Sequence, residues 1–201
     1  MTRNVDRRID RRRVIARSER SEHDLLLGFR CRLLRAIDEL GDGRQRRTKL
    51  AILAVRKVLP IWETSFPTDD APQQVLALVE ETLTGTLIVR EIAEREFNNI
   101  WSHCDELNFY RNEHSKAITV GYAAAKAGWE SLSETPGGCD ERITDASTDH
   151  DNDAYDSDAS LDASLVYCNG GIWDEGSDNE KRLEFWTWWL TSAVRAVTLP
   201  E

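Results

Sequence analysis

The sequence predicts an all-α protein, a single-domain bundle of seven to eight helices with an acidic loop before the last two helices. Three observations support this fold class. Apolar residues recur at spacings of three and four over several long segments, which is the period of an amphipathic helix. Glycine and proline separate these segments. No segment alternates apolar and polar residues as a half-buried strand would.

The helices are predicted, in chain order, over residues 21–40, 44–59, 72–84, 87–107, 113–132, 154–168 and 179–197. Gly41 follows the first helix as a C′ residue, and Pro60 is expected to end the second because it has no amide proton. Pro72 suits the first position of the third helix. Residues 1–20 are predicted as a charged arm or helix, and residues 21–201 as the domain.

Small residues mark one face of the helix over 113–132. They are Ala117, Gly121, Ala124 and Gly128, and they predict that a neighbouring helix approaches closely. The C-terminal helix carries aromatic residues on two faces, at Phe185, Trp186, Trp188 and Trp189. Trp186 and Trp189 are expected in the core. The other two are expected to pack on Trp62 or Trp129, or to stay open as an anchor for a partner.

The cysteines indicate a reduced protein. Cys31, Cys104, Cys139 and Cys168 lie far apart without a CxxC spacing, so they are interpreted as small apolar residues rather than as a disulfide framework or a zinc site. No run of about 18 apolar residues and no secretory signal is present. A cytoplasmic protein with no membrane partner is therefore expected.

Charge is divided unevenly along the chain. Residues 1–60 hold 17 Lys and Arg against 8 Asp and Glu, although the whole chain has a net charge of −10. Residues 131–180 hold one basic residue, Arg142, and fourteen acids: Glu134, Asp140, Glu141, Asp145, Asp149, Asp151, Asp153, Asp156, Asp158, Asp162, Asp174, Glu175, Asp178 and Glu180. Such an asymmetry bears on partners and association rates rather than on fold.

The sequence gives little support for catalysis or for metal binding. A calcium loop starting at Asp149 would have Ala154 where a glycine is required and Ser160 where a bidentate glutamate is required, so a solvated acidic loop is the simpler interpretation. No histidine lies in an HExxH arrangement, and His103 beside Cys104 does not make a dyad by adjacency. We therefore predict no enzymatic activity, no catalytic residue, no metal and no cofactor.

The arginines of residues 1–20 leave an alternative open. They could serve a nucleic-acid-associated regulatory protein. However, acidic residues lie three or four positions from several of them, which favours ion pairs within a helix. The acidic remainder would also repel phosphate, so nucleic acid is not the expected partner.

Two blocks carry a resemblance to a known family. "VLPIWE" at 58–63 and "FWTWWL" at 185–190 look like those of an all-α group of bacterial immunity proteins from polymorphic toxin and contact-dependent inhibition systems. "GYAAA" at 121–125 and "CNGGIW" at 168–173 fall between them in the expected order. The resemblance covers roughly residues 25–197. It implies a protein that binds and neutralises a cognate toxin domain without enzymatic activity.

Charge and resemblance together predict an immunity protein that neutralises its toxin through an acidic surface. A nuclease toxin would suit this surface, because a basic cleft that binds phosphate would also attract carboxylates. The predicted partner-binding residues are Asp149, Asp151, Asp153, Asp156, Asp158, Asp162 and Trp173.

Overall fold

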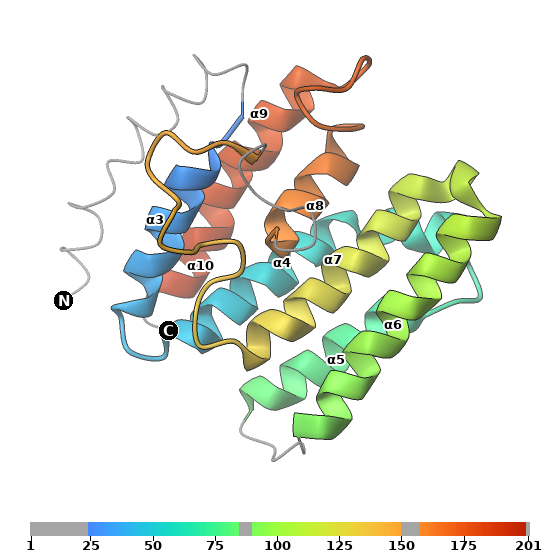
Figure 1. Ribbon diagram of the computed structural model, residues 1–201, viewed down its shortest axis with the longest axis horizontal. Coiled ribbons are helices and arrows are strands. Elements are labelled where there is room, and N and C mark those ends of the chain that lie inside the picture. Colours follow the sequence, from blue (N-terminus) through green and yellow to red (C-terminus); the bar gives the residue numbers. More distant parts are fainter. Residues whose placement is uncertain (1–23, 85–89, 150–156, 200–201) are drawn as a thin grey trace.

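The computed structural model describes residues 24–84, 90–149 and 157–199 (Figure 1). These ranges form helices joined by loops and contain no strand, which confirms the all-α prediction. The elements are α3 (Leu27–Asp38), α4 (Gly43–Ser65), α5 (Ala71–Leu83), α6 (Arg90–Tyr110), η1 (Asn112–His114), α7 (Ser115–Leu132), α8 (Ala159–Tyr167), α9 (Asn179–Trp188), the π-turn η3 (Trp189–Ala193) and α10 (Val194–Thr198). The predicted arm over 1–20 and the predicted helix start at Ser21 lie outside the described residues, so the domain division stays a prediction.

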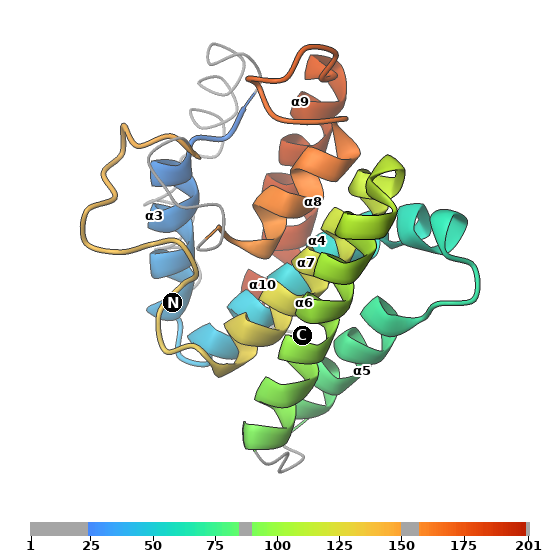
Figure 2. The same ribbon diagram turned by 45° about the vertical axis from the view of Figure 1, so that its right-hand side comes forward.

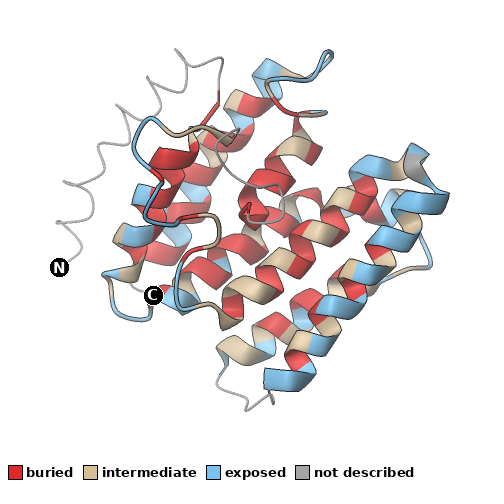
Figure 3. Cartoon of the chain, in the orientation of Figure 1, coloured by how far each residue is buried: buried red, intermediate tan, exposed pale blue. Residues whose placement is uncertain are grey.

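Helix α7 lies at the centre of the bundle, in contact with α4, α5, α6 and α8 (Figure 2). Its small-residue face is buried, as the sequence predicted. A Cβ atom added to Gly121 would lie 2.3 Å from Cys104 Sγ, and one added to Gly128 would lie 2.5 Å from Phe97 Cδ1. Both contacts are with α6, so the missing side chains allow α6 and α7 to pack closely. Most residues of α7 are buried, and buried residues also line the helices around it (Figure 3).

Helix α4 differs from the prediction, because it continues through Pro60 to Ser65. A proline inside a helix costs about 3 kcal/mol through its lost hydrogen bond and its steric clash. The continuation places Trp62 in the core, where it is fully buried, and its Nε1 donates to the Asp69 carbonyl at 2.7 Å. Burying and satisfying this large indole offsets the cost of the proline.

The C-terminal helix also departs from a regular pattern. The π-turn η3 separates α9 from α10 and inserts a residue into the helical repeat. Trp186 and Trp189 are buried, as predicted. On the second aromatic face, Phe185 is buried against Tyr167 on α8, with ring centroids 5.7 Å apart, so it is not the open anchor that was one of the expectations. Trp188 is only partly buried and lies under Lys57, whose Nζ is 4.5 Å from the ring centroid.

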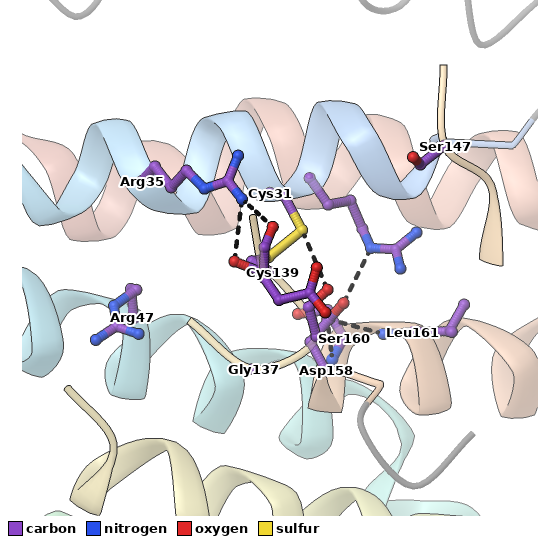
Figure 4. Close-up of a disulfide and its surroundings, with 12 residues drawn as sticks. Cys31, Arg35, Arg47, Gly137, Cys139, Ser147, Asp158, Ser160 and Leu161 are labelled. Atoms are coloured by element: carbon purple, nitrogen blue, oxygen red, sulfur yellow. Dashed lines mark hydrogen bonds and ion pairs between the residues drawn. A yellow bond between two sulfur atoms is a disulfide. The ribbon is translucent and has the colours of Figure 1, made fainter. Parts of the chain in front are cut away.

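The structure corrects the prediction of a fully reduced chain. Cys31 on α3 and Cys139, in the loop after α7, form a disulfide between residues 108 positions apart (Figure 4). Arg35 reinforces the same junction by donating to the carbonyls of Cys139, at 3.0 Å, and Asp140, at 2.6 Å. The sequence could not reveal the pair, because only the fold brings α3 against that loop. The thiols of Cys104 and Cys168 are free and buried.

Candidate partner-binding surface

Three of the predicted partner-binding aspartates lie inside the protein. The side chains of Asp149, Asp158 and Asp162 are 3%, 9% and 9% exposed. The acidic run was expected to face solvent, and for these three residues the structure shows the opposite. Asp151, Asp153 and Asp156 lie outside the described residues. Whether a partner contacts any of the six stays a prediction.

Asp149 and Asp158 are held by Arg30, a fully buried side chain of α3. Arg30 Nε donates to Asp158 Oδ2 at 3.0 Å, and its two terminal nitrogens both donate to Asp149. The guanidinium also donates to the Leu25 carbonyl and lies over the Trp186 ring, 5.3 Å from its centroid. A buried charge is tolerated only when it is paired in this way.

Asp158 has a second role, as the N-cap of α8. Its Oδ1 accepts from the amides of Ser160 and Leu161, at 2.9 and 3.1 Å, which satisfies two amides of the first turn (Figure 4). The same carboxylate therefore starts α8 and binds Arg30 of α3. The sequence prediction missed this role because it began the helix at residue 154.

Asp162 pairs with Lys126 of α7 at 2.8 Å and accepts from Ser157 Oγ at 3.1 Å. Burial raises the pKa of Asp162 above its usual value, while Lys126 and the hydrogen bonds oppose the shift. Burial also raises the pKa of Asp24, with a further contribution from the nearby Asp149. Asp24 Oδ1 accepts from Trp186 Nε1 at 2.8 Å. These buried polar contacts join α8 to α7, and the segment before α3 to α9.

A sequence signal for this buried cluster existed. Arg30 is four residues after Leu26 and three before Leu33, so it lies on the apolar face of its own helix. A charged residue on a buried face requires an opposite charge inside the core. The fold alone decides which acids supply that charge, because residues 149 and 158 are more than a hundred positions away.

Other carboxylates do face solvent. In the loops on either side of α8, the exposed acids are Glu134, Asp140, Glu141, Asp145, Asp174 and Glu175. Trp173 lies beside the last two and is 46% exposed. Its ring covers Gly171, whose amide donates to Asp174 Oδ2 at 2.8 Å. Trp173 is thus the one predicted site residue within the described ranges that presents a large exposed side chain.

An open groove of about 1180 Å³ runs between α6, α7 and the loop after α7. Trp101 and Trp129 line it together with Arg90 and Lys126. The two cations are already paired, Arg90 with Glu94 and Lys126 with Asp162. The groove thus offers aromatic surface flanked by further charged side chains, among them Arg35 and the exposed Glu141.

The described residues offer no evident catalytic or metal-binding group. They contain no group of three or more His, Cys, Asp or Glu side chains that could hold a metal ion. Burial, with a smaller contribution from Asp105, raises the pKa of Cys104 to about 12, so its thiol is not a ready nucleophile. His103 binds Asp69 instead, with 2.7 Å between Nε2 and Oδ2. Within the described ranges, no helix is both long and apolar enough to cross a membrane.

The described residues combine paired internal charges with exposed acids and exposed aromatic rings, and the family comparison gives the class of the chain: it is an immunity protein. A sequence model of the family described as Immunity protein Imm5 matches residues 9–196. The chain therefore belongs to the Imm5 family of immunity proteins. The match confirms the resemblance at the level of an immunity protein family. No relative was found among curated proteins.

Proposed function

We propose that this chain binds and neutralises the toxin domain of a polymorphic toxin or contact-dependent inhibition system, and that it does so without enzymatic activity. The observation that carries the proposal is the family match over residues 9–196. An inhibitor of this kind needs a stable body and a surface complementary to its target. It needs no nucleophile, metal or cofactor of its own.

The proposed contact is acidic. The chain has a net charge of −10, and exposed carboxylates lie in the loop after α7 and in the α8–α9 loop, where Trp173 is also exposed. Complementary charge raises association rates, which suits a protein that must reach a toxin before damage occurs. A basic, phosphate-binding cleft would match this surface, so a nuclease is the proposed toxin class. Asp151, Asp153 and Asp156 remain part of the proposal.

The proposed compartment is the cytoplasm, where a toxin that attacks nucleic acid would act. The disulfide between Cys31 and Cys139 argues against this location, because structural disulfides are rare in a reducing cytosol. Cell fractionation with alkylation of free thiols measures both the compartment and the state of the two cysteines. Recovery of the protein outside the cytoplasm would refute the location.

The function is tested by co-expression with the toxin domain encoded by the neighbouring gene. The wild-type chain is expected to co-purify with that domain and to restore growth of cells that produce it. A chain that neither binds the domain nor protects the cells would refute the proposed function.

The acidic contact is tested with charge-removing variants. The triple variant Asp151→Asn, Asp153→Asn and Asp156→Asn, and separately Trp173→Ala, are expected to weaken toxin binding. The matched control neutralises three exposed glutamates on other elements, Glu63, Glu81 and Glu91. Asp158 is left unchanged, because its loss would disturb folding. If all variants bind the toxin equally well, the interface does not include these residues.

A further inference from the structure

Two adjacent aromatic residues at the C-terminal end of α6 stand out on the surface. Phe109 is 79% exposed and Tyr110 is 77% exposed, with their ring centroids 4.8 Å apart in an edge-to-face arrangement. The other large apolar residues counted as exposed within the described ranges are only 41–46% exposed. The end of α6 is visibly exposed in Figure 3. The pair is therefore not part of the protein's own core and adds little buried apolar area to it.

The surroundings of the pair are acidic. Asp105 and Glu106 are exposed on the last turns of α6, and Glu113 is 62% exposed in the following turn. Asp105 accepts a hydrogen bond from Tyr122 at 2.6 Å, which fixes its carboxylate near this end. The last turn of α6 has no basic residue, so the negative end of the helix dipole adds to these charges.

Arg111 directly follows the pair and offsets only part of this negative charge, because the three carboxylates of Asp105, Glu106 and Glu113 outnumber it. Arg111 lies over the Phe66 ring, 5.1 Å from its centroid, and contacts His114 Nε2 at 3.1 Å. Its Nε is 3.9 Å from Glu113, the outer limit of an ion pair. Two open ring faces thus lie among carboxylates and helix carbonyls, an arrangement that favours guanidinium and ammonium groups.

This region adjoins the loop that carries Trp173. Lys116, in the first turn of α7, donates to Asn169 Oδ1 at 2.7 Å and so links the α6–α7 connection to the α8–α9 loop. Both segments lie in the upper half of the view in Figure 1. The aromatic pair can therefore extend the acidic surface around Trp173 rather than form an isolated patch.

We propose that Phe109 and Tyr110 are the anchoring residues of the interface, and that they receive arginine or lysine side chains from a basic surface of the toxin domain. The inference rests on the proposed function and names a part of the surface that the sequence did not indicate. Exposed aromatic residues that become buried in a complex commonly dominate its binding energy. The acids around them supply charge complementarity and speed the encounter.

The test compares two ends of one helix. Phe109→Ala/Tyr110→Ala is expected to leave the melting temperature unchanged and to weaken toxin binding about 30-fold or more, the factor that corresponds to a hot spot. Ile92→Ala, at the N-terminal end of α6 and 42% exposed in the wild type, is the matched control and should bind as the wild type does. Glu106→Lys should slow association roughly threefold to tenfold at low salt, whereas Glu91→Lys should not.

The outcomes separate this inference from the proposed function. If the wild-type chain binds the toxin and the double alanine variant binds it equally well, the aromatic pair is not the anchor and the proposed function stands. If the wild-type chain does not bind the toxin, the proposed function itself fails. Self-association of the wild-type chain in sedimentation, abolished by Phe109→Ala/Tyr110→Ala, would overturn the inference in favour of a second copy as occupant.

Discussion

The contact between α6 and α7 allows one prediction to be worked out in detail. Gly121→Ala adds a Cβ atom 2.3 Å from Cys104 Sγ and 3.0 Å from Trp62 Cζ3. Overpacking of this kind costs about 1–3 kcal/mol, and the sulfur contact is short enough to place the cost at the upper end. Alanine is favoured over glycine inside a helix by about 1 kcal/mol. The net loss of stability is therefore expected to be about 2 kcal/mol.

Removing the sulfur should remove most of this loss. Cys104→Ala alone is expected to cost about 1 kcal/mol, because it leaves a small void in the core. In that background the added Cβ meets only the Trp62 ring, so the remaining overpacking of about 1 kcal/mol is offset by the gain in helix propensity. Gly121→Ala should then be nearly neutral, and the coupling energy between the two sites should be about 2 kcal/mol.

The assay is urea unfolding of the four proteins of this double-mutant cycle, followed by tryptophan fluorescence. Ala77→Gly, at an exposed position of α5, measures the propensity effect alone and should cost about 1 kcal/mol. Losses that add within about 0.5 kcal/mol would refute the reasoning, since Gly121 and Cys104 would then not compete for the same space.

Three further predictions concern the buried charges and the disulfide. Arg30→Met should lower the free energy of unfolding by about 3–5 kcal/mol, because it leaves two buried carboxylates without their cation. Cys31→Ser/Cys139→Ser should lower it by about 2–4 kcal/mol, because the unfolded chain is no longer closed into a long loop. Burial raises the pKa of Glu130 from 4.5 to about 7, so the folded state holds the proton more tightly and stability should fall as pH rises between these values.

Each of these predictions has a control. Arg32→Met, on the same helix but at an exposed ion pair, should change stability by no more than about 0.5 kcal/mol. A reductant should lower the free energy of unfolding of the wild type. It should leave that of Cys31→Ser/Cys139→Ser unchanged. The pH effect amounts to up to about 3 kcal/mol and should be absent in Glu130→Gln. Equal losses for both arginine variants, no response to the reductant, or the same pH profile in Glu130→Gln would contradict the corresponding argument.

Local sequence patterns predicted most of the helices because helix formation depends on neighbours three and four residues apart. The small-residue face of α7 was recognised from spacing alone, and the structure confirms its burial. The end of α4 was predicted wrongly, because the rule for proline is local whereas the burial of Trp62 is a property of the whole core. The π-turn near Trp189 was missed for the same reason.

The candidate surface was harder to predict than the fold. An aspartate in an acidic run has the same local sequence whether it faces solvent or an arginine. The sequence by itself determined the helical class, the acidic balance and the resemblance to immunity proteins. Only the tertiary structure decided that Asp149 and Asp158 neutralise Arg30 and that Phe109 and Tyr110 remain outside. The physical reason is that burial and ion pairing depend on contacts between segments far apart in the sequence. The periodicity of residues along the chain does not indicate which of these segments are in contact.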